Sequence, residues 1–139
     1  MASIKDIEKV VESQEEVVDI TIRDPSGEPY RAKDGSPATI GVVGSESKTY
    51  KAAAALEARR MRNAALSGLD DEARARSRVN RAVAAVKRWH GWDDGKKELD
   101  CTPENVRALL SAPAAEHILD QVERGVHGHA LFSGSGSSD

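Results

Sequence analysis

Apolar side chains recur at helical spacing near the start of the chain, at Ile4, Ile7, Val10 and Val11. Ser3 is a candidate N-cap, and Asp6 lies three residues later, where a capping box places an acidic or amide side chain. We therefore predict a helix over residues 3–14, with one apolar stripe along it.

The period then changes from that of a helix to that of a strand. Val18, Ile20 and Ile22 alternate with polar residues as far as a turn signal at residues 24–27. A second strand is predicted over residues 38–43, before Gly44. Residues 16–44 thus predict a two- or three-stranded antiparallel sheet. Since a lone hairpin is only marginally stable, it must pack on another element, and we expect the next helix to be that element.

Two helices are predicted in the middle of the chain. Residues 48–66 are rich in alanine and lack glycine and proline, with Ser45 or Ser47 as the N-cap. Asp70 is placed to cap the second helix, residues 70–89. Its apolar stripe has helical spacing and consists of Val79, Ala82, Val83, Val86 and Trp89. Residues 67–69 connect the two predicted helices, and a connection this short predicts an antiparallel helical hairpin.

Shorter helices are predicted after the glycines at 91 and 95. Thr102 and Pro103 carry the signals of an N-cap and a first helical position, and a second short helix is expected over residues 114–124. The predicted fold class is α+β, mainly α-helical, with a small N-terminal β-hairpin packed on the helical hairpin. We expect an N-terminal unit over 1–90, a short-helix C-terminal unit over 91–132 and a flexible Gly/Ser-rich tail over 133–139.

Charge is distributed unevenly along the 139 residues, whose net charge is −3. Residues 1–30 hold three basic and eight acidic side chains. Residues 48–90 hold eleven basic and four acidic side chains, and residues 91–139 hold four basic and nine acidic ones. One interpretation is that the acidic ends fold back on the basic middle or that each face is simply solvated. The other is that the basic middle meets an acidic partner.

Few residues point to catalysis or to a bound cofactor. No phosphate-binding loop, nucleophile elbow or zinc spacing is present, so no catalytic, cofactor-binding or metal-binding residue is predicted. The four histidines are expected to be exposed. Cys101 precedes a predicted helix N-terminus, which lowers the pKa of a thiol, but no partnering base stands out. No apolar run approaches the ~20 residues of a membrane span, and we expect a protein of the cytosol without membrane contact.

Trp89 and Trp92 are the two tryptophans of the chain. They either pack the C-terminal unit onto the helical hairpin or supply an anchor for a partner, since tryptophan is common at binding hot spots. The arginines between residues 59 and 88 could contact phosphates, but they are spread around two helices without interleaved aromatic residues. Nucleic-acid binding is therefore the weaker expectation.

The order of motifs from Trp89 to Phe132 resembles the C-terminal half of tail assembly chaperones of long-tailed bacteriophages. The matching elements are Trp89 to Gly95, Thr102-Pro103-Glu104-Asn105, Leu109-Leu110, Pro113, Gln121-Val122 and Leu131-Phe132. Upstream, residues 20–50 are similar to the opening of that family, so the likeness covers roughly residues 18–132. The family tends to have aromatic residues where this chain has Cys101 and Ala114.

The resemblance implies a non-enzymatic assembly factor that binds the tape-measure protein and helps recruit tail-tube protein. It also implies action in the host cell cytoplasm, absence from the mature virion and association into homo-oligomers. We place the partner surface on the basic helix faces and on apolar residues of the C-terminal unit: Trp89, Trp92, Val106, Leu109, Leu110, Ile118 and Val122.

Two other functions remain open at this point. A small structural virion protein, such as a connector or tail component, would share much of this composition. A nucleic-acid-binding regulator would use the basic residues 59–88.

Overall fold

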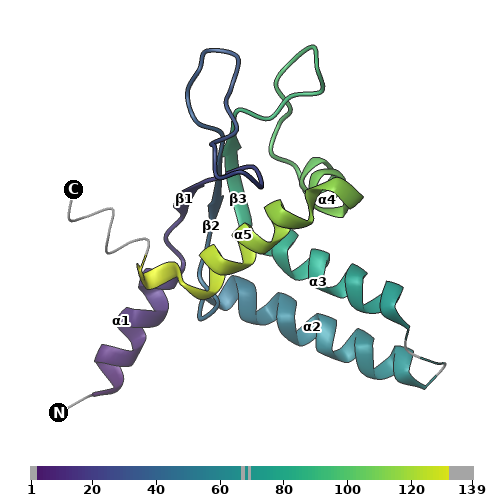
Figure 1. Ribbon diagram of the computed structural model, residues 1–139. Helices are drawn as coiled ribbons and strands as arrows, with labels where there is room; N and C mark the ends of the chain where they lie inside the picture. Colours follow the sequence, from purple (N-terminus) through teal and green to yellow (C-terminus); the bar gives the residue numbers. More distant parts are fainter. Residues whose placement is uncertain (1–2, 67, 69, 132–139) are drawn as a thin grey trace.

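The structure is a computed structural model, and it describes residues 3–66, 68 and 70–131. The elements in chain order are α1 (Ile4–Gln14), β1 (Val18–Thr21), β2 (Thr39–Val42), α2 (Lys48–Ala65), α3 (Asp71–Ala85), β3 (Val86–His90), α4 (Pro103–Ser111), the 3-10 turn η1 (Pro113–Ala115) and α5 (Glu116–His127). The protein is thus α+β and mainly helical, as predicted (Figure 1). The tail expected at 133–139 lies outside the described residues.

Four helices begin at the polar residues that the sequence marks as caps. The side-chain oxygen of each cap accepts a hydrogen bond from the backbone N–H three residues further on. These caps are Ser3, Ser47, Asp70 and Thr102. In α1 the Asp6 carboxylate also accepts from the N–H of Ser3, which completes the predicted capping box.

The sheet has three antiparallel strands in the order β1-β2-β3. The first two form the predicted pair, with Ile20 opposite Ile40. The third strand comes from residues 86–90, which we predicted as the end of a helix, and that prediction was wrong. Val86 adopts an extended conformation at the end of α3, and the following residues pair with the free edge of β2, where Trp89 lies opposite Ile40. The spacing of the apolar residues fits a helix, but β-branched and aromatic residues are also favoured in strands. Pairing with β2 therefore decides the conformation here.

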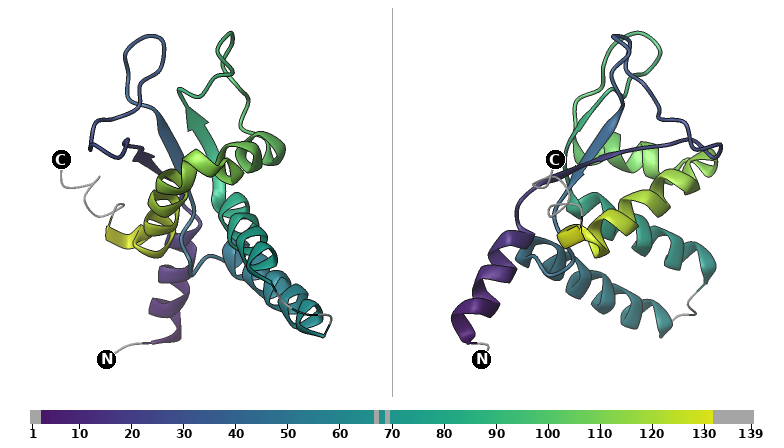
Figure 2. Two further views of the ribbon diagram at one scale, coloured as in Figure 1. Left: turned by 45° about the vertical axis from the view of Figure 1, so that its right-hand side comes forward. Right: turned by 60° about the vertical axis from the view of Figure 1, so that its left-hand side comes forward.

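Helix α5 lies against β1 and β2 (Figure 2). The helix backbone approaches the sheet closely at Gly125, where a Cβ atom would lie 1.8 Å from Cδ1 of Ile20. We predicted that this helix ends at residue 124, but it continues through Gly125 to His127. Glycine at this position brings the helix backbone onto the sheet, so α5 covers the face for which we had expected residues 48–66.

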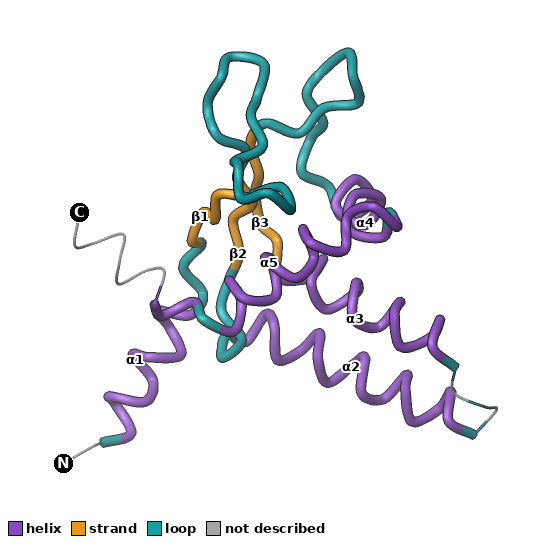
Figure 3. Tube along the Cα trace, viewed as in Figure 1, coloured by secondary structure: helices purple, strands orange, loops and turns teal. Residues whose placement is uncertain are grey.

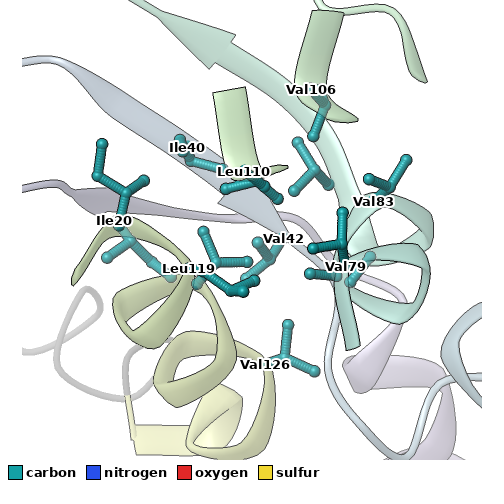
Figure 4. Close-up of a cluster of buried hydrophobic side chains, with 14 of the residues drawn as sticks. Ile20, Ile40, Val42, Val79, Val83, Val106, Leu110, Leu119 and Val126 are labelled. Atoms are coloured by element: carbon teal, nitrogen blue, oxygen red, sulfur yellow. The ribbon is translucent and has the colours of Figure 1, made fainter. Parts of the chain in front are cut away.

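The buried apolar side chains form one core cluster. It joins β1 and β2 with one face each of α3, α4 and α5, through Ile40, Val42, Val79, Leu110 and Leu119 among others (Figure 4). Residues from both predicted units, 1–90 and 91–132, contribute to it. Helix α2 differs, because Glu57 is its one buried residue among those described, and it packs along α3.

Two parts of the chain extend away from this core, although the end of α3, with Val79 and Val83, belongs to it. Helix α1 and the hairpin of α2 and α3 leave the body in different directions (Figures 1 and 3). We call the α2–α3 hairpin, residues 48–85, the arm.

The turn at Gly91 offers a test of the sheet edge, with Gly95 as its control. Both glycines have positive φ, +89° and +93°, but a Cβ at Gly91 would lie 3.1 Å from Cα of Ala38, while one at Gly95 meets nothing within 4 Å. Gly95→Ala should cost about 1 kcal/mol of unfolding free energy from backbone strain. Gly91→Ala should cost about 2 kcal/mol or more, because the contact adds to the strain. Urea unfolding measures both, and equal losses would contradict this packing.

Candidate interaction surfaces

Four of the seven residues predicted to bind a partner are core residues. Val106, Leu110, Ile118 and Val122 are buried in the central cluster. An amphipathic pattern identifies the face of a helix that is covered, but the rest of this same chain covers these faces. A partner could reach them only by opening the fold, so their burial argues against a binding role, which stays a prediction. A polar substitution at Leu110 would test folding and not binding.

The other three, Trp89, Trp92 and Leu109, are partly buried against the core. The two indole rings lie 6.3 Å apart. Trp89 donates its indole N–H to the carbonyl of Leu99 at 2.8 Å, and Trp92 donates to that of Thr39 at 3.0 Å. The indoles therefore fasten the segment after β3 to the sheet, and a binding role for these three residues stays a prediction.

Tyr30 extends this aromatic group across the sequence. Its ring centroid lies 5.8 Å from that of Trp92, and its hydroxyl lies 2.6 Å from Nε2 of His117 on α5. The loop between β1 and β2 carries Tyr30, so the ring joins segments far apart in the chain. The sequence offers no local signal for this, because Tyr30 lies in a polar loop between two turns.

The histidines are not all exposed, contrary to the prediction. His129 is almost fully buried, with Nε2 at 2.6 Å from the carbonyl oxygen of Glu16 and Nδ1 at 3.5 Å from Nε2 of Gln14. The end of α1 is thereby attached to the chain segment that follows α5. Within residues 3–66, 68 and 70–131, no three His, Cys, Asp or Glu side chains gather closely enough to hold a metal ion.

One serine–histidine pair lies beside a cavity of about 210 Å³. Oγ of Ser36 is 2.7 Å from Nε2 of His90 and 2.5 Å from Oδ1 of Asp34, and Nδ1 of His90 is 3.7 Å from Glu98. A carboxylate only accepts hydrogen bonds, so the hydroxyl of Ser36 donates its hydrogen bond to Asp34. Nε2 of His90 must then donate to the hydroxyl oxygen of Ser36. In this arrangement His90 is not the base for Ser36, and the network joins two loops.

Cys101 is partly buried, and this burial raises the pKa of its thiol. The sequence had suggested the opposite direction from its place before a helix N-terminus. Desolvation disfavours the thiolate here, so the residue lacks the environment of an activated nucleophile.

The acidic ends neutralise part of the basic middle. The guanidinium of Arg78 on α3 bonds to Asp120 and to Glu123 on α5, and Glu116 lies 3.8 Å away. Hydrogen bonding to Glu123 is the largest cause that raises the pKa of Arg78. On the sheet, the guanidinium of Arg88 donates to both carboxylate oxygens of Asp19, from Nε at 2.8 Å and from Nη2 at 2.9 Å. The fold-back interpretation therefore holds for these two arginines.

Further along the arm the charges are not neutralised in this way. Arg59 and Arg62 are exposed, and neither makes an ion pair with any described residue. With 3.6 residues per turn, they share the outer face of α2 with Ala52 and Ala55. Among the described residues, Arg74 and Arg76 pair with neighbouring carboxylates of their own helix, Asp71 at 3.8 Å and Glu72 at 3.4 Å. Exposed pairs of this kind contribute little to stability. The outer face of α2 around Arg59 and Arg62 therefore remains basic.

A groove of about 330 Å³ runs between α2, the end of α3 and the start of α4. Its apolar lining residues, which we call its floor, are Ala53, Leu56, Val83, Ala84, Val86 and Pro103. Three cations stand around it, Arg60, Lys87 and Arg107, and its one carboxylate among the described lining residues is Glu57. Arg60 and Asn80 bind that carboxylate, at 2.7 and 3.3 Å. We call this hollow the arm groove.

Comparisons with known protein families, with curated proteins and with solved structures found no match. Among the described residues, no helix is both long enough and apolar enough to cross a membrane.

The ion-pair cluster at Arg78 is expected to support the contact between α3 and α5. Arg78→Met should lower the free energy of unfolding by about 2 kcal/mol, because it leaves the carboxylates of Asp120 and Glu123 close together without their cation. The matched control Arg76→Met, on the exposed face, should cost less than about 0.5 kcal/mol. Urea unfolding measures both, and equal effects would refute a stabilising role for Arg78.

The raised pKa of Cys101 predicts slow thiol labelling. At mildly alkaline pH less of the folded thiol is ionised, so a thiol reagent should react more slowly with the folded protein than with the same protein in denaturant. Raising the pH should narrow the difference. Faster labelling of the folded protein would contradict this environment.

Proposed function

We propose that this protein is a tail assembly chaperone of a long-tailed bacteriophage. In this proposal it binds the tape-measure protein and helps recruit tail-tube subunits in the cytoplasm of the host, and it is absent from the finished virion. The support from sequence is the order of motifs over residues 18–132. The support from structure is the arm, whose outer surface the fold itself does not use.

The arm has the properties of a binding element for a helical partner. It extends from the body as two antiparallel helices (Figure 1). The outer face of α2 presents small alanines between basic side chains. Small residues let a second helix approach closely, and cations favour a partner with an acidic edge. Because the core is complete without this face, binding would require no opening of the fold.

Capture of a co-expressed tape-measure fragment tests this proposal. The double variant Arg59→Glu/Arg62→Glu should reduce capture by about tenfold or more, since it reverses the charge of the outer face. The control Lys96→Glu/Lys97→Glu makes the same charge change on the loop at the other end of the molecule and should leave capture unchanged (Figure 1). Absence of capture by the unaltered protein would refute the proposal, and equal capture by both variants would refute the assignment to the arm.

Arg59 and Arg62, which form no ion pair with the residues that the structure describes, also suit nucleic acid, which is the second candidate. DNA mobility shifts that weaken as salt increases, together with no capture of the tape-measure fragment, would favour a nucleic-acid-binding regulator. Mass spectrometry of purified particles distinguishes a structural virion protein from a chaperone. A chaperone should be missing from them, whereas a structural protein should be present in a defined copy number.

A further inference from the structure

Helix α1 presents an apolar face that the rest of the described chain does not cover. Ile4, Ile7 and Val10 are 75%, 61% and 56% exposed. The sequence predicted this helix and its apolar stripe, and the structure shows the stripe exposed. An isolated helix of eleven residues is marginal in water, so an exposed stripe of this kind calls for a covering surface.

The helix is held at one end alone. The carbonyl of Gln14 accepts from the N–H of Gly44 at 2.7 Å, and the Glu15 carboxylate accepts from Thr49. From this attachment α1 points away from α2 and α3 in each view (Figures 1 and 2). No described residue that lines the arm groove comes from α1, so α1 does not occupy the arm groove of its own chain.

The charges around the apolar face indicate what could cover it. On a helix of 3.6 residues per turn, Glu8 and Asp6 lie on its two edges, while Lys5 and Lys9 lie on the opposite side. A covering surface should thus be apolar with a basic rim. Two α1 helices packed face to face would bring these acidic edges together, which disfavours that pairing.

The arm groove has the complementary character. Its apolar floor includes Leu56, which is 42% exposed, and its rim carries Arg60, Lys87 and Arg107. Its one carboxylate, Glu57, is already held by Arg60 and Asn80. The apolar floor of the arm groove thus matches the apolar stripe of α1, and its basic rim matches the acidic edges of α1.

We propose that α1 of one copy docks in the arm groove of a second copy. Ile7 and Val10 pack against the floor at Leu56, and Asp6 and Glu8 face the cationic rim. Such a contact is head-to-tail, because each copy contributes a helix at one site and a groove at another, so it builds rings or open chains. This inference does not depend on the tape-measure protein, since it needs a single kind of chain.

Sedimentation of the full chain over a concentration series tests the proposal. The unaltered protein should associate, and Ile7→Asp or Leu56→Glu should each weaken association by more than about tenfold. The matched controls, Lys9→Asp on the back of α1 and Ala58→Glu on the far side of α2, should leave it unchanged. Association is also expected to weaken as salt increases.

Mixing the two variants gives the sharpest test. The Ile7→Asp chain keeps an intact groove and the Leu56→Glu chain keeps an intact α1, so together they should form a one-to-one complex. A face-to-face α1 pair predicts no such complex. Both substituted residues are exposed, and circular dichroism checks that the variants fold, with Ile7→Ser and Leu56→Ser as milder replacements. A protein that stays monomeric at all concentrations, variants that associate like the unaltered chain, or a mixture without a complex would each overturn the proposal.

Discussion

The direct passage from α3 into β3 sets the geometry of this protein. Ala85 ends the helix and Val86 begins the strand, so no loop separates the arm from the sheet. The strand is held by its pairing with β2, and α3 is held by Arg78 bonded to Asp120 and Glu123 of α5. Because α5 in turn lies on β1 and β2, the direction of the arm is a consequence of the same contacts that form the core.

The body and the arm are stabilised in different ways. In the body, aliphatic side chains from the sheet, α3, α4 and α5 exclude water together, and burial of this kind supplies most folding free energy. In the arm, α2 contributes the buried carboxylate Glu57, which is bonded to Arg60 and Asn80. Polar contacts of this kind contribute little net stability, so the outer half of the arm has less to hold it than the body has. A basic surface on such an element is suited to a partner that adds the missing contacts.

Local signals in the sequence predicted much of the fold. The four polar N-caps, the paired strands around Ile20 and Ile40 and the helix after Pro103 all depend on interactions within a few residues or on a period of two. The strand at 86–90 was not predictable in this way, because the spacing of Val83, Val86 and Trp89 fits a helix. Its conformation depends on the free edge of β2, which is far away in the sequence.

The candidate sites were less predictable than the fold, for a related reason. Apolar periodicity marks Leu110 and Val122 as covered, but it does not tell whether the cover is this chain or a partner. The same ambiguity applied in reverse to Ile4, Ile7 and Val10, which are exposed. The contacts of Tyr30 with Trp92 and of His129 with Glu16 join distant segments and have no local signature.

Native-state hydrogen exchange on a dilute, monomeric sample tests whether α1 and the outer arm are surfaces for partners and not parts of the core. Amides of α1, in residues 4–11, and of the outer arm, in residues 58–66 and 70–76, should exchange far faster than those of β2 and α5, because few buried apolar contacts oppose their local opening. Protection of those two segments equal to that of β2 and α5 in the monomer would contradict it.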